Sequence, residues 1–173
     1  MATSVVVTAV LWGALIWIGY SSGLRFPVAG GAGREQDWGE LGPILATNLA
    51  AALGLASGML TAGLSTFASS IILGLFTGAV FHGAVDALGA AGAAQTLAPY
   101  FVFEGLGLLA ASVAGFIPVL GLLRHWGAGG AVTVRSSLRA YGAAVRWTLP
   151  PLATSLVLIT AGAVLEVIGG IPQ

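Results

Sequence analysis

Long apolar segments alternate with short polar ones along the chain, and this pattern predicts helices that cross a membrane. A helix needs about 20 mostly apolar residues to cross a bilayer. The sequence therefore predicts an all-α transmembrane bundle with five spans, at residues 4–20, 44–62, 65–86, 99–123 and 148–169. No Asp, Glu, Lys or Arg occurs between residues 44 and 85. That stretch is long enough for two crossings, with a re-entrant pair as the alternative.

Two polar segments interrupt the apolar pattern. Residues 21–43 combine charged residues with Gly and Pro and are predicted to form an extramembrane loop. Residues 124–147 form an Arg-rich loop, within which residues 135–147 are predicted to be a helix at the lipid headgroups. Arg135, Arg139 and Arg146 fall on one face of that helix, toward anionic lipid or solvent.

The placement of arginine predicts an orientation for this single transmembrane domain. Four of the six Arg lie in the segment 124–147 and two lie in the segment 21–43. The positive-inside rule then places the Arg-rich loop and the N-terminus in the cytoplasm, with the protein in the plasma membrane. The first span has no basic residue before it, so it is expected to be retained rather than cleaved as a secretory signal.

Composition narrows the classes of function. The chain of 173 residues is 57% hydrophobic and 7% charged, whereas soluble domains carry about 25% charged residues. Six acidic residues balance the six Arg, so no basic patch suited to nucleic acid is present. The chain has no Cys, which excludes disulfides, thiolate nucleophiles and Cys-ligated zinc.

Small residues recur at intervals of about four along the predicted spans, a spacing that lets helices in a membrane pack closely. The predicted packing positions are Gly54 and Gly58 in the second span, Ser70, Gly74 and Gly78 in the third, and Gly107, Ala111 and Gly115 in the fourth. We expect these positions to form helix–helix interfaces, within the chain or with partner subunits.

Strongly polar side chains also lie inside the predicted spans, and all of them fall toward the same side of the membrane. They are Asn48, His82, Asp86, Glu104 and Glu166. Pro99 is predicted to open the fourth span, which would place Glu104 about 7.5 Å along its axis. Polar residues at such depth usually face the protein interior or a water-filled cavity. The sequence therefore predicts a buried polar cluster in the outer leaflet.

Each member of this cluster also has a structural interpretation. Asn48 can form a helix–helix hydrogen bond, and His82 with Asp86 can form an i,i+4 pair at a helix end. Glu104 can be a hydrogen-bonded structural acid or a functional one. The ligand types would suit a metal ion, but their spacing does not require one. Because motifs of known enzymes are also missing, we expect a non-enzymatic protein without cofactor or metal.

The polar residues resemble the pattern of the stage II sporulation protein M family of bacterial and archaeal membrane proteins. The matching positions are Asn48, the segment Ser69-Ser70 with Gly74, the segment Pro99-Tyr-Phe-Val-Phe-Glu104, and Glu166. Tyr100 and Phe101 replace the His and Gly of the family's Pro-His-Gly-x-x-Glu motif, and Ser69-Ser70 replaces an Asn-Gly pair. The resemblance implies a helical membrane component that works in an assembly, in spore formers with cell-wall-degrading partners.

Two functions from different classes follow. The first is a structural or assembly subunit that joins other membrane-protein subunits, or copies of itself, through faces rich in Gly and Ala. The alternative is a small transporter or channel in which Glu104 and Glu166 handle protons or a cation. No polar residues continue a path through the cytoplasmic half of the spans, which favours the first function. An intramembrane enzyme is a third hypothesis with no motif behind it.

Overall fold

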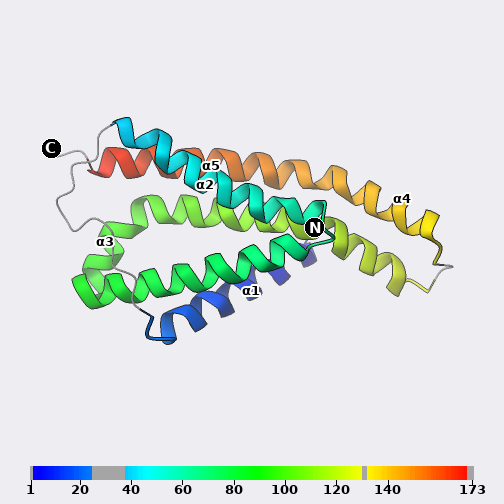
Figure 1. Ribbon diagram of the computed structural model, residues 1–173, viewed down its shortest axis with the longest axis horizontal. Coiled ribbons are helices and arrows are strands. Elements are labelled where there is room, and N and C mark those ends of the chain that lie inside the picture. The colour runs from blue at the N-terminus through cyan, green and yellow to red at the C-terminus, as the bar shows by residue number, and fades with distance from the viewer. Residues whose placement is uncertain (1, 25–37, 130–131, 171–173) are drawn as a thin grey trace.

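The chain is all-helical in the computed structural model, which describes residues 2–24, 38–129 and 132–170 (Figure 1). The α-helices are α1 (Ala2–Ser21), α2 (Leu41–Ala56), α3 (Leu64–Gly127), α4 (Val134–Val145) and α5 (Leu149–Gly170). Short 3-10 helices flank them, namely η1 (Trp38–Glu40), η2 (Ser57–Met59) and η3 (Arg146–Thr148). Within the described ranges, four helical stretches are long and apolar enough to cross a membrane: Ala2–Ser21, Trp38–Met59, Leu64–Gly127 and Val134–Ile168. These helices indicate a multi-pass membrane protein.

Helix α3 folds back on itself at Gly89 (Figure 1). With 64 residues it would measure about 96 Å if it were straight, far more than one bilayer crossing. Gly89 has φ 72° and ψ 166°, a conformation that is essentially restricted to glycine. The bend divides α3 into an N-terminal arm (residues 64–88) and a C-terminal arm (residues 90–127). The predicted third and fourth spans are thus the two arms of one bent helix.

The predicted third and fourth spans, 65–86 and 99–123, imply a loop at residues 87–98, and this expectation is wrong. Apart from Gly89, the whole segment is helical, and Pro99 lies inside the C-terminal arm instead of opening it. The segment is rich in alanine, which has the highest helix propensity of all residues, and this explains the difference. The helix can therefore continue through a stretch that hydropathy alone assigns to a turn.

The two arms contact each other along their length. Near the bend, the ring of Phe81 meets that of Phe101 edge to face at a centroid distance of 4.6 Å. At the other end, the Thr66 side chain lies against Gly115. The arms therefore form an antiparallel helical pair on which the other helices pack.

The centre of the bundle is the middle of the C-terminal arm, where every residue from Ala111 to Pro118 is buried. Its core cluster draws on α1, α2, α3 and α5, and comprises Trp12, Ala52, Leu55, Ala111 and Ile159. The Trp12 indole Nε1 donates a 3.1 Å hydrogen bond to the Ser112 hydroxyl, which fixes α1 against this arm.

The two predicted polar segments are shorter than expected. Of residues 21–43, those from 25 to 37 lie outside the described residues, and α2 already begins at Leu41. In the segment 124–147, α3 extends to Gly127, and α4 begins at Val134 after a capping box made by Thr133 and Ser136. Figure 1 shows α4 continuing through η3 nearly in line with α5 and packing beside the end of α3. The predicted interfacial helix is thus part of a helical hairpin at one end of the bundle.

Candidate functional site

The small residues of the N-terminal arm of α3 face α1. Ser70, Gly74 and Gly78 are all buried. A Cβ added to Gly74 would lie 2.6 Å from the Leu15 Cβ, and one added to Gly78 would collide with the α1 backbone at Ile16. Any larger side chain at these glycines would push α1 away. This stripe therefore serves packing within the chain.

The small residues of the C-terminal arm are used in the same way. A Cβ on Gly107 would lie 2.7 Å from Ile159 Cγ1 of α5, and one on Gly115 would collide with the Leu55 backbone. Ala111 between them is fully buried in the core. In the segment formed by α2 and η2, Gly58 lies against Thr66 and Gly54 lies near Ser69. The predicted packing positions thus all contact other segments of the same molecule.

Glu104 lies where three helices meet. The Asn48 amide Nδ2 of α2 donates a 2.6 Å hydrogen bond to Glu104 Oε1 on α3. On the α5 side, a Cβ on Gly162 would collide with Glu104 Cγ and approach the Tyr100 carbonyl oxygen within 3.3 Å. Glu104 is half-buried, and no cationic side chain among the described residues forms an ion pair with it.

Glu166 of α5 belongs to the same neighbourhood. It is half-buried, and its charge is close enough to act on both Glu104 and Tyr100. It lies one helical turn beyond Gly162 on α5, so the glycine that admits Glu104 also brings the second acid near it. Two carboxyl groups and one amide from α2, α3 and α5 are therefore brought together, and we call this set the Glu104 site.

Gly162 also belongs to this site, although it was not predicted from the sequence. Its signal was present, since Gly162 precedes Glu166 by four residues and the two share a helix face. Its role nevertheless depends on the partner helix, because only the close approach of α3 and α5 makes a side chain at this position impossible.

A cavity of about 270 Å³ adjoins the Glu104 site. Glu104 and Asn48 line it together with Tyr100, and its other walls come from α1, α2 and both arms of α3. The aromatic walls are Trp12, Phe76, Phe81 and Phe101. The cavity is thus a largely apolar space with a carboxylate and an amide at one side.

His82 and Asp86 form a separate pair. The His82 Nε2 lies 3.6 Å from Asp86 Oδ2, and the His82 ring meets the Tyr20 ring of α1 edge to face at 5.2 Å. The prediction of one buried cluster is wrong for Asp86, because its side chain is 41% exposed. The N-terminal arm turns His82 toward α1, whereas Glu104 faces α2 and α5. Over the described ranges, no three His, Asp or Glu side chains converge as metal ligands would.

Charge is distributed unevenly between the two ends of the bundle. The start of α2, the bend of α3 and the end of α5 lie at one end (Figure 1), and the described acids belong to that half: Glu40, Asp86, Glu104 and Glu166. The described arginines, Arg124, Arg135, Arg139 and Arg146, lie at the α3–α4 turn or shortly after it, and all are exposed. Among the described residues, the acids therefore lie in one half of the bundle and the arginines lie at the other end.

Comparisons of the chain with protein-family models, with curated proteins and with solved structures found no match. The resemblance to the stage II sporulation protein M family remains a prediction from the residues named above.

Proposed function

We propose that this protein is a non-enzymatic assembly subunit of a membrane complex, and that a helix of another membrane protein docks on α2. The observation that carries the proposal is a stripe of small residues that the described parts of the chain leave open. Gly42, Ala46 and Ala50 follow one another at intervals of four on α2, and all three are exposed.

This α2 stripe contrasts with the other small-residue stripes. A Cβ on Gly42 would meet no atom within 4 Å, whereas the predicted packing glycines of the two α3 arms (Gly74, Gly78, Gly107 and Gly115) are in tight contact with neighbouring segments. The α2 region is also the least buried of the four candidate spans, with 22% of its most apolar window inside the bundle. In a membrane, small residues favour helix association because they let two backbones approach closely.

The basic end of the bundle supports an orientation for this subunit. All four described arginines belong to the last turn of α3 and to the segment from α4 to η3. The positive-inside rule places this end in the cytoplasm, and the N-terminus of α1 points toward the same end (Figure 1). The Glu104 site then belongs to the outer half of the membrane.

The assembly role can be tested by filling the α2 stripe. In the full chain, A46L/A50L is expected to lose a stoichiometric partner, or self-association, when membranes are solubilised in mild detergent. The control is Ala153→Leu, which adds the same bulk to an exposed alanine on α5. Both variants should keep the wild-type melting temperature, because all three alanines are exposed. Equal assembly of A46L/A50L and the control would exclude α2 as the docking face.

Proton or cation handling is a second candidate function, which the cavity beside Glu104 favours. A carboxylate in a membrane interior is costly without a counter-charge, and Glu104 has a second acid near it instead of a cation. Reconstitution in liposomes tests this function, since Glu104→Gln should abolish a proton or cation flux that the wild-type protein carries. If the wild-type protein carries no flux, this candidate is rejected.

The resemblance to the stage II sporulation protein M family also supports the assembly role, since it implies a membrane component that works in an assembly. Three of the residues on which it rests, Asn48, Glu104 and Glu166, make up the Glu104 site. The departures at Tyr100 and Phe101 lie beside this site, where both line the cavity with Glu104.

A further inference from the structure

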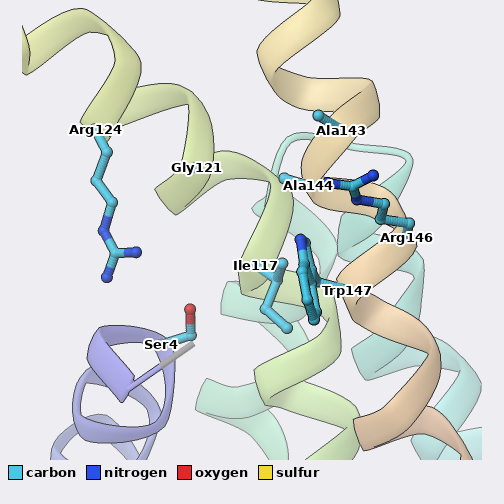
Figure 2. Close-up of a pocket in the computed structure, with 8 residues that line it drawn as sticks. All are labelled: Ser4, Ile117, Gly121, Arg124, Ala143, Ala144, Arg146 and Trp147. Atoms are coloured by element: carbon cyan, nitrogen blue, oxygen red, sulfur yellow. The ribbon is translucent and has the colours of Figure 1, made fainter.

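A second cavity, of about 400 Å³, lies at the basic end of the bundle and shares no lining residue with the cavity beside the Glu104 site. It opens between the first turn of α1, the last turns of α3, and the junction of α4 with η3 (Figure 2). Ile117, Gly121 and Ala144 form its apolar walls. A Cβ on Gly121 would lie 2.9 Å from that of Ala144, so small residues bring α3 and α4 together at this place.

Two arginines from different helices line this cavity. Figure 2 shows Arg124 of α3 extending toward the α1 turn that carries Ser4, while Arg146 and Trp147 lie on the opposite side. The Arg146 guanidinium carbon lies 5.6 Å from the centre of the Trp147 ring, a cation–π geometry that holds this side chain at the cavity. Arg124 and Arg146 are separated by the opening between them rather than paired with an acid.

Nothing in the described parts of the chain neutralises these two charges. The acids that the structure describes belong to the other half of the bundle, and none forms an ion pair with Arg124 or Arg146. Guanidinium groups bind phosphate oxygens through charge-assisted and often bidentate hydrogen bonds. A cavity with an apolar wall and two unneutralised guanidinium groups therefore suits an amphipathic anion that carries a phosphate.

We propose that this cavity binds the headgroup of an anionic phospholipid between Arg124 on one side and Arg146 on the other, with the acyl chains on the apolar outer surface of the bundle. Trp147 and Leu149, which follow Arg146, are both large, apolar and more than half exposed, so lipid-accessible surface begins directly beside the site. This position also matches the level at which Trp side chains occur in membranes, next to the headgroups. The site is distinct from a general attraction between exposed arginines and the membrane surface.

The experiment compares two double variants with the same loss of charge. The full chain is purified in a non-ionic detergent, and binding of phosphatidylglycerol, phosphatidylcholine and inorganic phosphate is measured by native mass spectrometry and by shifts of the melting temperature. R124Q/R146Q removes the two ligands. R135Q/R139Q is the matched control, since both of its arginines are exposed and neither lines the cavity.

We expect the wild-type protein and R135Q/R139Q to bind one phosphatidylglycerol in preference to phosphatidylcholine. R124Q/R146Q should bind it about tenfold more weakly or worse, because two charge-assisted contacts are lost. Equal losses in the two double variants would show only general electrostatic attraction and would overturn the proposal. Equal binding of phosphatidylcholine would also overturn it.

Two further arms complete the test. If inorganic phosphate raises the melting temperature as much as phosphatidylglycerol does, the site takes soluble phosphate and the lipid proposal is wrong. R124K/R146K keeps both charges without the guanidinium geometry, and we expect it to fold like the wild-type protein and to retain part of the lipid preference. If R124K/R146K prefers phosphatidylglycerol over phosphatidylcholine no more than R124Q/R146Q does, charge recognition at this cavity is rejected.

Discussion

The side-chain amide of Asn48 donates a 2.6 Å hydrogen bond to the carboxylate of Glu104 and so joins α2 to α3 inside the bundle. This bond connects the helix with the open small-residue stripe to the helix that forms the core. It also accounts for one acceptor oxygen of a carboxylate at a depth where water is scarce. Substitutions at Glu104 should therefore separate hydrogen bonding from charge.

Glu104→Gln should keep the protein folded, because the amide oxygen of Gln can still accept the hydrogen bond from Asn48. Glu104→Leu should lower the free energy of unfolding by about 1–3 kcal/mol, since it leaves the Asn48 amide without its partner. Reversible unfolding in detergent micelles measures both. If Glu104→Leu is as stable as Glu104→Gln, the hydrogen bond does not stabilise the bundle.

Gly162→Leu should separate α5 from the C-terminal arm of α3, because a side chain there would collide with Glu104 and Tyr100. We expect a loss of about 2 kcal/mol or more, in the range found for overpacked cores. The control is Gly13→Leu on α1, where a Cβ would meet no atom within 4 Å. If Gly162→Leu and Gly13→Leu have the same melting temperature, the close approach of α3 and α5 is contradicted.

The interface between α1 and the N-terminal arm of α3 gives a similar test. Gly74→Leu and Gly78→Leu should each lower the melting temperature, because Leu15 and the α1 backbone at Ile16 leave no space for a side chain. Leu73→Ile, which conserves volume on the same arm, should have a mild effect. Wild-type stability of both glycine variants would show that α1 does not pack on this stripe.

Hydropathy predicted the positions of α1, α2 and α5 well, because a long apolar run has few alternatives in a membrane. It misplaced the boundary between the two arms of α3. Asp86 and Pro99 suggested a loop between them, whereas the alanines in between continue the helix and Gly89 alone makes the bend. The chain reversal depends on the backbone conformation of one glycine among 27, and composition does not identify which one.

For the candidate site, the sequence predicted how deep each polar residue lies in the membrane. It did not predict which neighbouring helix each side chain faces. Asn48, Glu104 and Glu166 were expected at the same level, and the structure brings them together from three helices. His82 was expected at that level too, but the N-terminal arm directs it toward Tyr20. The rotation of a helix about its axis depends on its packing partners, which a single sequence does not specify.

The bend at Gly89 leads to the last prediction. Its φ of 72° combined with ψ of 166° lies in a region that side chains with a Cβ rarely adopt. Gly89→Ala should therefore cost about 1–3 kcal/mol, although a Cβ at this position would meet no atom within 4 Å. The penalty would come from the backbone alone, so smaller neighbouring side chains should not relieve it.

Gly105→Ala is the matched control, because this glycine is helical and its Cβ would be in ordinary contact with Phe101 at 3.5 Å. There alanine should be neutral or slightly stabilising, as its helix propensity exceeds that of glycine.

The distance between spin labels at Phe81 and Phe101 reports on the reversal directly, since the two rings are 4.6 Å apart when the arms are antiparallel. Gly89→Ala should broaden that distance distribution or lower the melting temperature. If both measurements match those of Gly105→Ala, the reversal of α3 does not require the conformation of Gly89.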